Sequence, residues 1–562
     1  MMRVSLFAFA LAGAAAIAAL QARQSAPAPA PADVIVVNGR VYTVDPQRAE
    51  AQAVAIRGDR IVAVGSTAEA LGLRGPRTQV IDAGGRAVIP GLHDAHGHML
   101  NLGESLQQID LRGTPSVDAV LDKVRARAAQ LPKGRWILGR GWDQNDWPDP
   151  AWPTAAQLDA ATPDHPVYLS RVDGHAAWAN TAALRAASVT AATVDPEGGR
   201  LLRTPKGEPT GVLVDRAMGL VSRQIPGPDR ATRREQLTLA DNLAASLGLT
   251  MVHDAGVSQA NAAMYREVVD AGALKTRLYV MLAPPAAGAS LPPPLIGYGS
   301  QLLTVRAVKL VADGALGSRG AALHEPYADE PGTRGLLVTP PEQLHAQALA
   351  AVRAGYQPCV HAIGDRANTA VLDLFEALQR EVPGSRALRM RNEHAQILRA
   401  ADIPRFEALD VIASVQATHA TSDMPWVARR IGGARTREGA YVWQSLRRSG
   451  AVLANGSDFP VEEPNPMFGF YAAVTRQDRD GRPPGGWTAD QRLSRAEALH
   501  SFTAGAAFAA HLERDLGTLR AGTLADLLIL SDDIMQIEPA RILKARPLLT
   551  MRGGRITHRD GL

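Results

Sequence analysis

The sequence predicts an α/β protein built on a (β/α)8 (TIM-like) barrel, with a small β-sandwich domain formed by both termini and a subdomain inserted over the barrel mouth. Three observations predict this arrangement. Short apolar runs alternate with helical patterns through the middle of the chain, which is typical of parallel strands joined by helices. Hairpin signals lie near both ends of the chain. The first two predicted barrel strands are too far apart for a single helical crossover, and the 562 residues exceed one compact core.

Residues 33–87 and 512–562 are predicted to form one composite β domain. An Asn-Gly pair at 38–39 separates two β-rich runs, which is a strong hairpin signal, and a second hairpin is predicted over residues 53–64. Near the C-terminus, residues 525–557 contain a strand pattern followed by another hairpin pattern. Because an isolated hairpin is barely stable, we expect these pieces to pair with one another.

The barrel is predicted over residues 88–511, with an insertion at about 136–216. The insertion is rich in Trp, Pro and Gly and interrupts the spacing of the strands. Parallel strands that are buried on both faces read as short apolar runs. The candidate strands are Ala87–Leu92, Leu249–Val252, Arg277–Leu282, Val305–Ala312, Gln357–His361, Arg391–His394, Val411–Val415 and Ala451–Ala454.

The composition argues against several classes of protein. Hydrophobic residues make up 46% of the chain and charged residues 21%, which is ordinary for a globular protein. The formal net charge is only +4 and no basic stripe is evident, so we expect no nucleic-acid partner. The single cysteine, Cys359, leaves no intrachain disulfide framework.

The N-terminus carries the pattern of a secretory signal peptide. Residues 1–22 contain Arg3 and a long apolar run, and residues 23–32 form a Pro/Ala linker. The competing interpretation is an uncleaved membrane anchor, because the run is near the lower length limit for a membrane span. The small residues that follow favour cleavage. We therefore expect a periplasmic or secreted protein with no stable membrane insertion once the signal is removed.

The first predicted barrel strand leads into a closely spaced group of histidines. Alternate side chains of a strand share a face, so His96 and His98 point the same way and His93 points the opposite way. Two converging imidazoles can bind a divalent cation such as zinc. A lone His-x-His is more often a pair of solvated loop histidines. This pair ends an apolar strand and has candidate partners downstream, which favours a metal site.

Further polar residues fall at the C-terminal ends of later predicted strands, where barrel enzymes place their active sites. They are Lys309, His361, His394 and Asp458. Each has an ordinary structural explanation on its own: a hydrogen-bonded core histidine, an ion-paired lysine, or an aspartate that caps a helix. Because a barrel mouth would gather all of them beside the histidine pair, we predict one shared metal site.

These motifs resemble those of the amidohydrolase superfamily, in the branch that includes the N-substituted formamide deformylases. The resemblance covers nearly everything from Asp33 to the C-terminus. The matching stretches are Pro90–His98, Val308–Arg319, His361–Asp365, Glu393–Gln396, Asn455–Pro460 and Gly517–Leu527. The resemblance implies a metal-bearing (β/α)8 barrel with a small β domain made from both termini, in agreement with the fold predicted above.

The resemblance also implies a set of metal ligands. They are His96, His98 and Asp458 for the more buried ion, and Lys309, His361 and His394 for a second ion. Lys309 would be carboxylated, which turns a cation into an anionic oxygen ligand that bridges the two ions. Zinc is the expected metal, and iron, manganese or nickel would fit similar ligands. Two ions are expected if Lys309 is carboxylated and one if it is not.

The expected function is metal-dependent hydrolysis of a non-peptide C–N (amide) bond in a small-molecule substrate. Metal coordination lowers the pKa of water to about 7, so that metal-bound hydroxide can attack the carbonyl. Asp458 would act as general base and then as general acid. Two alternatives remain open: a metal-dependent esterase or lactonase on the same barrel, and a non-catalytic binding protein. The sequence is also compatible with a homo-oligomer.

The expected substrate-binding residues lie in the insertion and near the ends of later strands. They are Trp142, Asp143, His175, Arg319, His419 and Asp423. The tryptophans of the insertion favour a hydrophobic or aromatic substrate. The alternative for all of these residues is structural, as packed aromatic rings and surface ion pairs.

Overall fold

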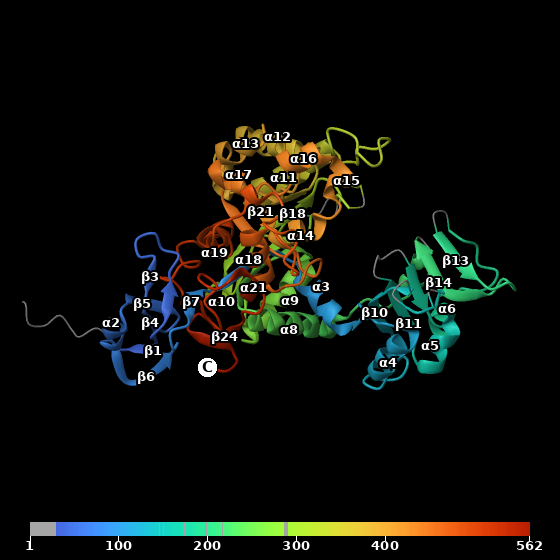
Figure 1. Cartoon of the computed structure of the whole chain (residues 1–562), viewed down its shortest axis with the longest axis horizontal. Helices are drawn as coiled ribbons and strands as arrows, with labels where there is room; N and C mark the ends of the chain where they lie inside the picture. Colours follow the sequence, from blue (N-terminus) through green and yellow to red (C-terminus); the bar gives the residue numbers. More distant parts are fainter. Residues whose placement is uncertain are drawn as a thin grey trace, which may run out of the picture.

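The computed structural model describes residues 30–144, 147–149, 151–171, 176–196, 199–215, 217–285, 290–317 and 319–562. The predicted signal peptide at 1–22, most of the predicted linker at 23–32 and the candidate residue His175 lie outside the described residues. The described chain has three parts, which Figure 1 shows as a β domain in blue and red, a central barrel, and an inserted lobe in cyan and green.

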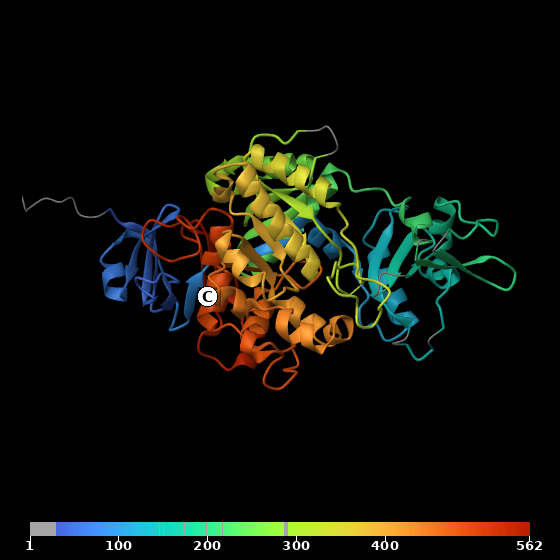
Figure 2. The same cartoon turned by 90° about the horizontal axis from the view of Figure 1, so that it is seen from above.

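Eight parallel strands at the centre of the molecule form a nearly closed barrel, which confirms the predicted fold class (Figure 2). Hydrogen-bonded ladders join neighbouring strands, and the last strand lies beside the first. In chain order the strands are β8 (Leu92–Gly97), β15 (Leu249–Val257), β16 (Arg277–Leu282), β18 (Leu303–Val311), β19 (Gln357–Ala362), β20 (Arg391–His394), β21 (Ile412–Gln416) and β22 (Leu453–Gly456).

Helices cover the outside of the barrel, and α12 (Asp365–Glu381) shows why they pack there. Its buried residues Val371, Leu374, Phe375 and Leu378 recur at helical spacing and turn one apolar face toward the strands. No helix among the described residues has the length and apolar character needed to cross a membrane. The other elements of the barrel and its loops are α3 (Met99–Gln107), α8 (Arg230–Ser246), α9 (Gln259–Asp270), β17 (Leu295–Gly297), α10 (Tyr298–Gln301), α11 (Pro341–Arg353), α13 (Ile403–Ala408), α14 (Ala417–Asp423), α15 (Val427–Ile431), α16 (Gly433–Gly439), α17 (Trp443–Arg448), α18 (Pro466–Thr475), α19 (Arg495–Ser501) and α20 (Ala504–Ala509).

Two sheets packed face to face form the β domain, and both ends of the chain contribute to it. One sheet has the order β5-β4-β1-β6 and the other has the order β25-β24-β23-β7-β2-β3. Val36 and Val54 from the first sheet share a buried core with Ile529 and Leu549 from the second. The elements are β1 (Ala32–Val37), β2 (Arg40–Tyr42), β3 (Glu50–Ala51), β4 (Ala53–Arg57), β5 (Arg60–Gly65), α2 (Thr67–Leu71), β6 (Arg74–Asp82), β7 (Ala87–Pro90), β23 (Leu527–Leu530), α21 (Pro539–Ile542), β24 (Pro547–Arg552) and β25 (Arg555–Arg559).

The run predicted as the first barrel strand, Ala87–Leu92, is divided between two domains. β7 pairs with β2 and β23 in the β domain, and the barrel strand β8 begins only at Leu92. Gly91 marks the change of sheet. A β-carbon at Gly91 would lie 2.2 Å from the Thr250 hydroxyl oxygen, so the close approach of β8 and β15 requires glycine there.

The insertion begins earlier than the sequence predicts, at β9 rather than near residue 136. β9 has only two residues, too few to give a strand pattern. The insertion forms its own sheet in the order β13-β14-β12-β11-β10-β9. Its elements are β9 (Ile109–Asp110), α4 (Val117–Ala128), β10 (Ile137–Trp142), α5 (Ala155–Ala161), β11 (Val167–Arg171), β12 (Ala176–Ala179), α6 (Thr181–Ala186), β13 (Gly199–Arg203), β14 (Pro209–Asp215) and, on the way back to the barrel, α7 (Met218–Ser222).

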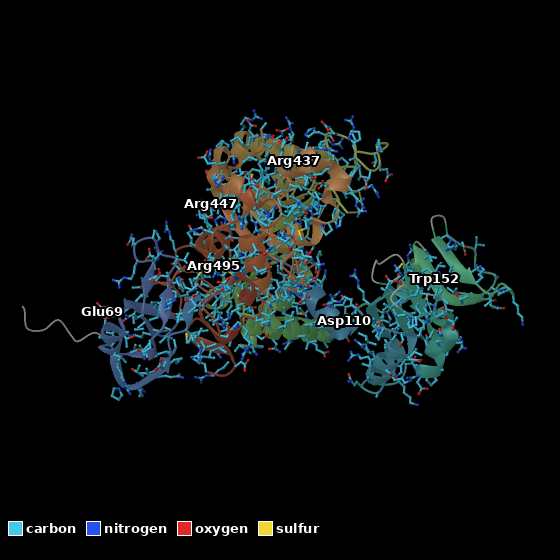
Figure 3. All side chains as sticks on the ribbon, viewed as in Figure 1. Glu69, Asp110, Trp152, Arg437, Arg447 and Arg495 are labelled. Atoms are coloured by element: carbon cyan, nitrogen blue, oxygen red, sulfur yellow. The ribbon has the colours of Figure 1, made fainter. Side chains whose placement is uncertain are left out.

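The insertion and the β domain lie on opposite sides of the barrel (Figures 1 and 2). Since β7 leads directly into β8, the β domain is at the end where the barrel strands start. The insertion connects α3, which follows β8, to α7 and α8, which precede β15. It is a lobe of its own, which carries the labelled residue Trp152 in Figure 3.

Candidate metal centre

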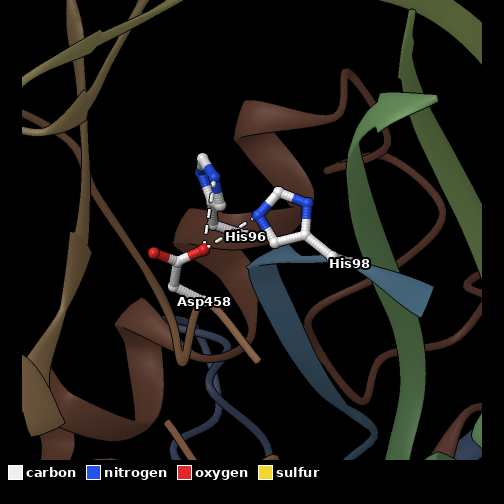
Figure 4. A group of neighbouring side chains, drawn as sticks. All are labelled: His96, His98 and Asp458. Atoms are coloured by element: carbon white, nitrogen blue, oxygen red, sulfur yellow. Dashed lines mark hydrogen bonds and ion pairs between the residues drawn. The ribbon is translucent and has the colours of Figure 1, made fainter. Parts of the chain in front are cut away.

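His96, His98 and Asp458 meet at the mouth of the barrel. His96 lies in β8 and is fully buried, His98 directly follows that strand, and Asp458 follows β22, the neighbour of β8. The Asp458 Oδ1 atom is 3.0 Å from His98 Nε2 and 3.8 Å from His96 Nε2. Figure 4 shows both histidine rings turned toward the Asp458 carboxylate. The ligand atoms of all three residues lie within 4.8 Å of one another, so one cation can reach all of them.

The later strands bring the other predicted ligands to the same place. The Lys309 amine lies 2.6 Å from His96 Nε2. The His394 ring is 4.9 Å from the His96 ring and 4.5 Å from the His361 ring, measured between centroids. A second group with metal-ligand spacing consists of His394, His419 and Asp458. The structure therefore gathers the histidines, the lysine and the aspartate that the sequence singles out.

The residues present fit a divalent cation. His361 Nε2 is buried and has no hydrogen-bond partner within the described ranges. A buried polar atom that is left unpaired costs about 1–3 kcal/mol, which argues that something else is bound there. Imidazole nitrogens with a carboxylate are the donors that zinc prefers.

Hydrogen bonds hold the far side of the His98 and His394 rings. His98 Nδ1 lies 2.9 Å from the Ala255 carbonyl oxygen, and His394 Nδ1 lies 2.8 Å from Gln416 Oε1. These bonds occupy Nδ1 and leave Nε2 of each ring for the centre. Fixing the second nitrogen in this way orients a ligand ring and keeps its tautomer.

His96 is oriented by a buried charge pair that sequence reasoning missed. Its Nδ1 lies 2.5 Å from Glu393 Oε2, and Arg391 Nε lies 2.7 Å from Glu393 Oε1. Arg391 also donates to the Ala95 carbonyl and contacts His253 Nδ1 at 2.9 Å. Both charged side chains are fully buried. The sequence could have indicated this pair, because it has two charged residues at alternate positions of a buried strand. Charged side chains are rarely fully buried unless they are paired.

Burial and local charge set the protonation of the centre. Burial lowers the pKa of His96 to about 4 and that of His361 to about 3, so both rings stay neutral at pH 7 and keep a lone pair. Burial also lowers the pKa of the Lys309 amine. Burial alone would lower the pKa of His98, but its hydrogen bond with Asp458 raises it. Burial alone would raise the pKa of Asp458, but the same hydrogen bond and the neighbouring imidazoles hold it well below its usual range.

Two residues of the centre have strained backbone. His394 has φ = 77° and Asp458 has φ = 60°, in the left-handed region that favours glycine. Such conformations cost of order 1–3 kcal/mol each and cluster at functional sites, where the surrounding structure holds them. Here they turn two side chains into the mouth at the ends of β20 and β22.

The predicted substrate-binding residues divide into two groups. His419 Nε2 lies 3.9 Å from Asp458 Oδ2, and Asp423 accepts hydrogen bonds from the Gln396 amide and the Tyr441 hydroxyl, so both lie near the centre. Arg319, after β18, is paired with Asp329 at 3.0 Å.

The insertion residues are placed elsewhere. Trp142 is completely buried in the core of the insertion, where its ring stacks on Trp147 and its Nε1 donates to the Leu169 carbonyl. Trp142 has no surface that a substrate could contact in this arrangement. It therefore has the structural role of a packed aromatic ring and not the predicted role in substrate binding. Asp143 forms an ion pair with Arg171. Large apolar rings form the core of a small domain as readily as they line a pocket, which is why sequence could not separate the two roles.

Comparison with known proteins identifies the family. The Amidohydrolase family model matches residues 79–558. The protein LONG AFTER FAR-RED 3 of Arabidopsis thaliana is 36% identical over 93% of this chain and 91% of its own. The N-substituted formamide deformylase of Arthrobacter pascens is 27% identical over 93% of this chain and 97% of its own. The crystal structure of an uncharacterised metal-dependent hydrolase from Pyrococcus furiosus superposes with a TM-score of 0.74 at 29% identity, covering 90% of this chain and all of that one. The chain therefore belongs to the amidohydrolase family, as its motifs predict, and is a hydrolase that acts on carbon–nitrogen bonds.

Proposed function

We propose that the protein is a metal-dependent amidohydrolase that cleaves a non-peptide amide bond in a small-molecule substrate. The observation that carries the proposal is the common centre of His96, His98 and Asp458 at the barrel mouth. The likeness to a protein named N-substituted formamide deformylase supports an amide as the bond cleaved. Zinc is the metal that we propose, because the donors are imidazole nitrogens and carboxylate oxygens.

Two metal contents are compatible with the residues present. His96, His98 and Asp458 would hold one ion, and His361 and His394 would hold a second ion together with a carboxylated lysine. The lowered pKa of Lys309 supports carboxylation, because the neutral amine is the form that reacts with carbon dioxide. A bound divalent cation supplies Lewis acidity, which polarises the scissile carbonyl and lowers the pKa of water to about 7.

The side chains of the centre have distinct tasks in this proposal. Asp458 takes the proton from the attacking water and returns it to the departing nitrogen. The hydrogen bond with His98 fixes the direction of its Oδ1 atom, while Oδ2 faces His419. The unpartnered Nε2 of His419 is available to donate to the carbonyl oxygen of the substrate as negative charge develops there.

Elemental analysis of the purified protein, followed by a screen of matched amides and esters, tests the proposal. We expect at least one equivalent of zinc per chain, release of amine from amides, and loss of turnover when a chelator removes the metal. Cleavage of esters or lactones without cleavage of any amide would contradict the proposed bond. Amide hydrolysis that survives complete removal of metal would contradict the proposed chemistry.

A further inference from the structure

The barrel closes at a seam between its last strand and its first. The sheet order of the described chain runs from β22 to β8, and no strand ladder joins these two strands, although they lie side by side. His96 and His98 come from the β8 side of the seam, and Asp458 comes from the β22 side (Figure 4). The geometry of the metal centre therefore depends on what holds the two strands together at this point.

The carboxylate of Asp94 bridges the seam. Asp94 lies in β8 and is 3% exposed. Its Oδ1 atom accepts the backbone N–H of His96 at 3.0 Å on its own strand and that of Ser457 at 3.1 Å on the other side. Its Oδ2 atom accepts the Ser457 hydroxyl at 2.6 Å. The side chain therefore supplies across the seam the hydrogen bonds that a ladder supplies between the other strands.

The backbone of β22 leaves room for this carboxylate. A β-carbon at Gly456 would lie 2.5 Å from Asp94 Oδ1 and 2.6 Å from the His96 backbone nitrogen. Glycine is therefore required at the end of β22, because any side chain there would occupy the position of the carboxylate. The close approach places the Asp94 carboxylate directly beside the chain that leads into Asp458.

The same contacts fix the backbone on both sides of Asp458. The Ser457 N–H group donates to Asp94. The next N–H group, that of Asp458, donates to the His96 carbonyl at 2.7 Å. The N–H group of Phe459 donates to the Ser457 hydroxyl oxygen at 3.2 Å. Three successive N–H groups are thus held, which is how the surrounding structure maintains the left-handed conformation of Asp458.

We propose that Asp94 is a positioning residue, which acts through Ser457 to hold Asp458 against the two imidazoles of the metal centre. Neither group of described side chains with metal-ligand spacing includes Asp94, so its role is to place ligands and not to bind the metal. Weakening the bridge lets Asp458 relax toward ordinary backbone angles, which moves its carboxylate away from the imidazoles. The inference rests on the metal centre of the proposed function, but not on the bond that is cleaved.

Visible spectroscopy of the cobalt-substituted, full-length enzyme tests the inference without using turnover, because the geometry of a transition-metal site depends on its ligands. Ser457→Ala removes one hydroxyl from the bridge. We expect it to change the cobalt spectrum and to weaken zinc binding about tenfold, measured by competition with a chromogenic chelator. Asp94→Asn turns an amide N–H group toward other donors, and it should weaken zinc binding about 100-fold.

A double variant tests whether the two residues act together. If Asp94 acts through Ser457, the variant that carries both Asp94→Asn and Ser457→Ala should lose little more zinc affinity than Asp94→Asn alone. Losses of affinity that multiply in the double variant would contradict this part of the inference.

The matched control is Asp241→Asn, at the end of the barrel where the strands begin. Asp241 lies in α8 and is also 3% exposed. It accepts the backbone N–H groups of Lys275 and Thr276 at 2.7 and 2.9 Å and the Thr276 hydroxyl at 2.5 Å, just before β16. Because it breaks the same kinds of hydrogen bond, it should lower the urea midpoint of unfolding as Asp94→Asn does. The cobalt spectrum and the zinc affinity should stay unchanged. Thr276→Ala matches Ser457→Ala in the same way.

The outcomes separate this inference from the proposed function. Wild-type spectra and zinc affinities in both Ser457→Ala and Asp94→Asn would overturn the inference and leave the proposed function intact. Equal changes in Asp241→Asn would also overturn it, because the centre would then respond to any loss of stability. If the variants change metal binding as expected but the wild type cleaves no amide, the proposed function fails and the positioning role stands.

Discussion

Glu393→Gln tests the claim that a buried charge pair orients His96. Glu393 lies 2.5 Å from His96 Nδ1 and 2.7 Å from Arg391 Nε, and all three side chains are completely buried. The substitution keeps the shape but removes the charge, and it leaves the Arg391 guanidinium without a counter-ion. Breaking a buried pair in this way costs about 3–5 kcal/mol of unfolding free energy. The charge-assisted hydrogen bond to the His96 ring becomes a weaker, neutral one, and disturbing such a partner of a ligand ring lowers metal affinity about 10- to 100-fold.

The control is Glu513→Gln, in another Arg–Glu pair with the same 2.7 Å separation. Its partner is Arg389, and the two side chains are 33% and 23% exposed. Solvent screens this pair, so its loss should cost less than about 1 kcal/mol and leave metal affinity unchanged. Urea unfolding followed by circular dichroism gives the free energies, and competition with a chromogenic chelator gives the zinc affinities. If the two variants behave alike in both assays, the account of how His96 is held is wrong.

Three further predictions concern the centre, the insertion and the N-terminus. Asp458→Asn should retain metal by elemental analysis but lose about 10²- to 10⁴-fold in kcat, and full turnover would exclude its role in proton transfer. Trp142→Ala should destabilise the insertion by about 3–5 kcal/mol, seen as faster proteolysis within residues 109–215, and the folded enzyme should keep its KM because Trp142 has no exposed surface. Protein recovered from an exporting host should begin after Ala22 or Ala26 by intact mass, and a chain that retains residues 1–22 would contradict the proposed signal peptide.

The barrel could be predicted because its strands follow a simple physical rule. Strands buried on both faces read as apolar runs, and Leu278 to Leu282 in β16 shows this directly, since every side chain is buried. The same alternation of faces brought His96 and His98 together and set His93 apart. Asp458 was found from its position after a strand, because the strands of a parallel barrel end at one rim.

Other features were beyond sequence reasoning for identifiable reasons. The division of Ala87–Leu92 between two sheets depends on the packing of Gly91 against Thr250, a contact between residues far apart in the chain. β9 has too few residues to show the alternation of apolar and polar side chains that identifies a strand. Glu393 belongs to one of the matching motifs, but only the fold shows that it pairs with Arg391 and holds the His96 ring.

A tryptophan such as Trp142 looks the same in a sequence whether it lines a pocket or packs in a core. Local patterns therefore predicted the elements and the residues that meet at the barrel mouth, while the contacts that support those residues depend on tertiary packing.

The most direct measurement is an anomalous difference map, recorded on both sides of the zinc absorption edge from crystals of the purified enzyme. We predict a peak within bonding distance of His96 Nε2, His98 Nε2 and Asp458 Oδ1, with a second peak beside His361 and His394 if Lys309 carries a carboxylate. A purified, active enzyme with no anomalous peak at the barrel mouth, or with its metal bound elsewhere, would contradict the account.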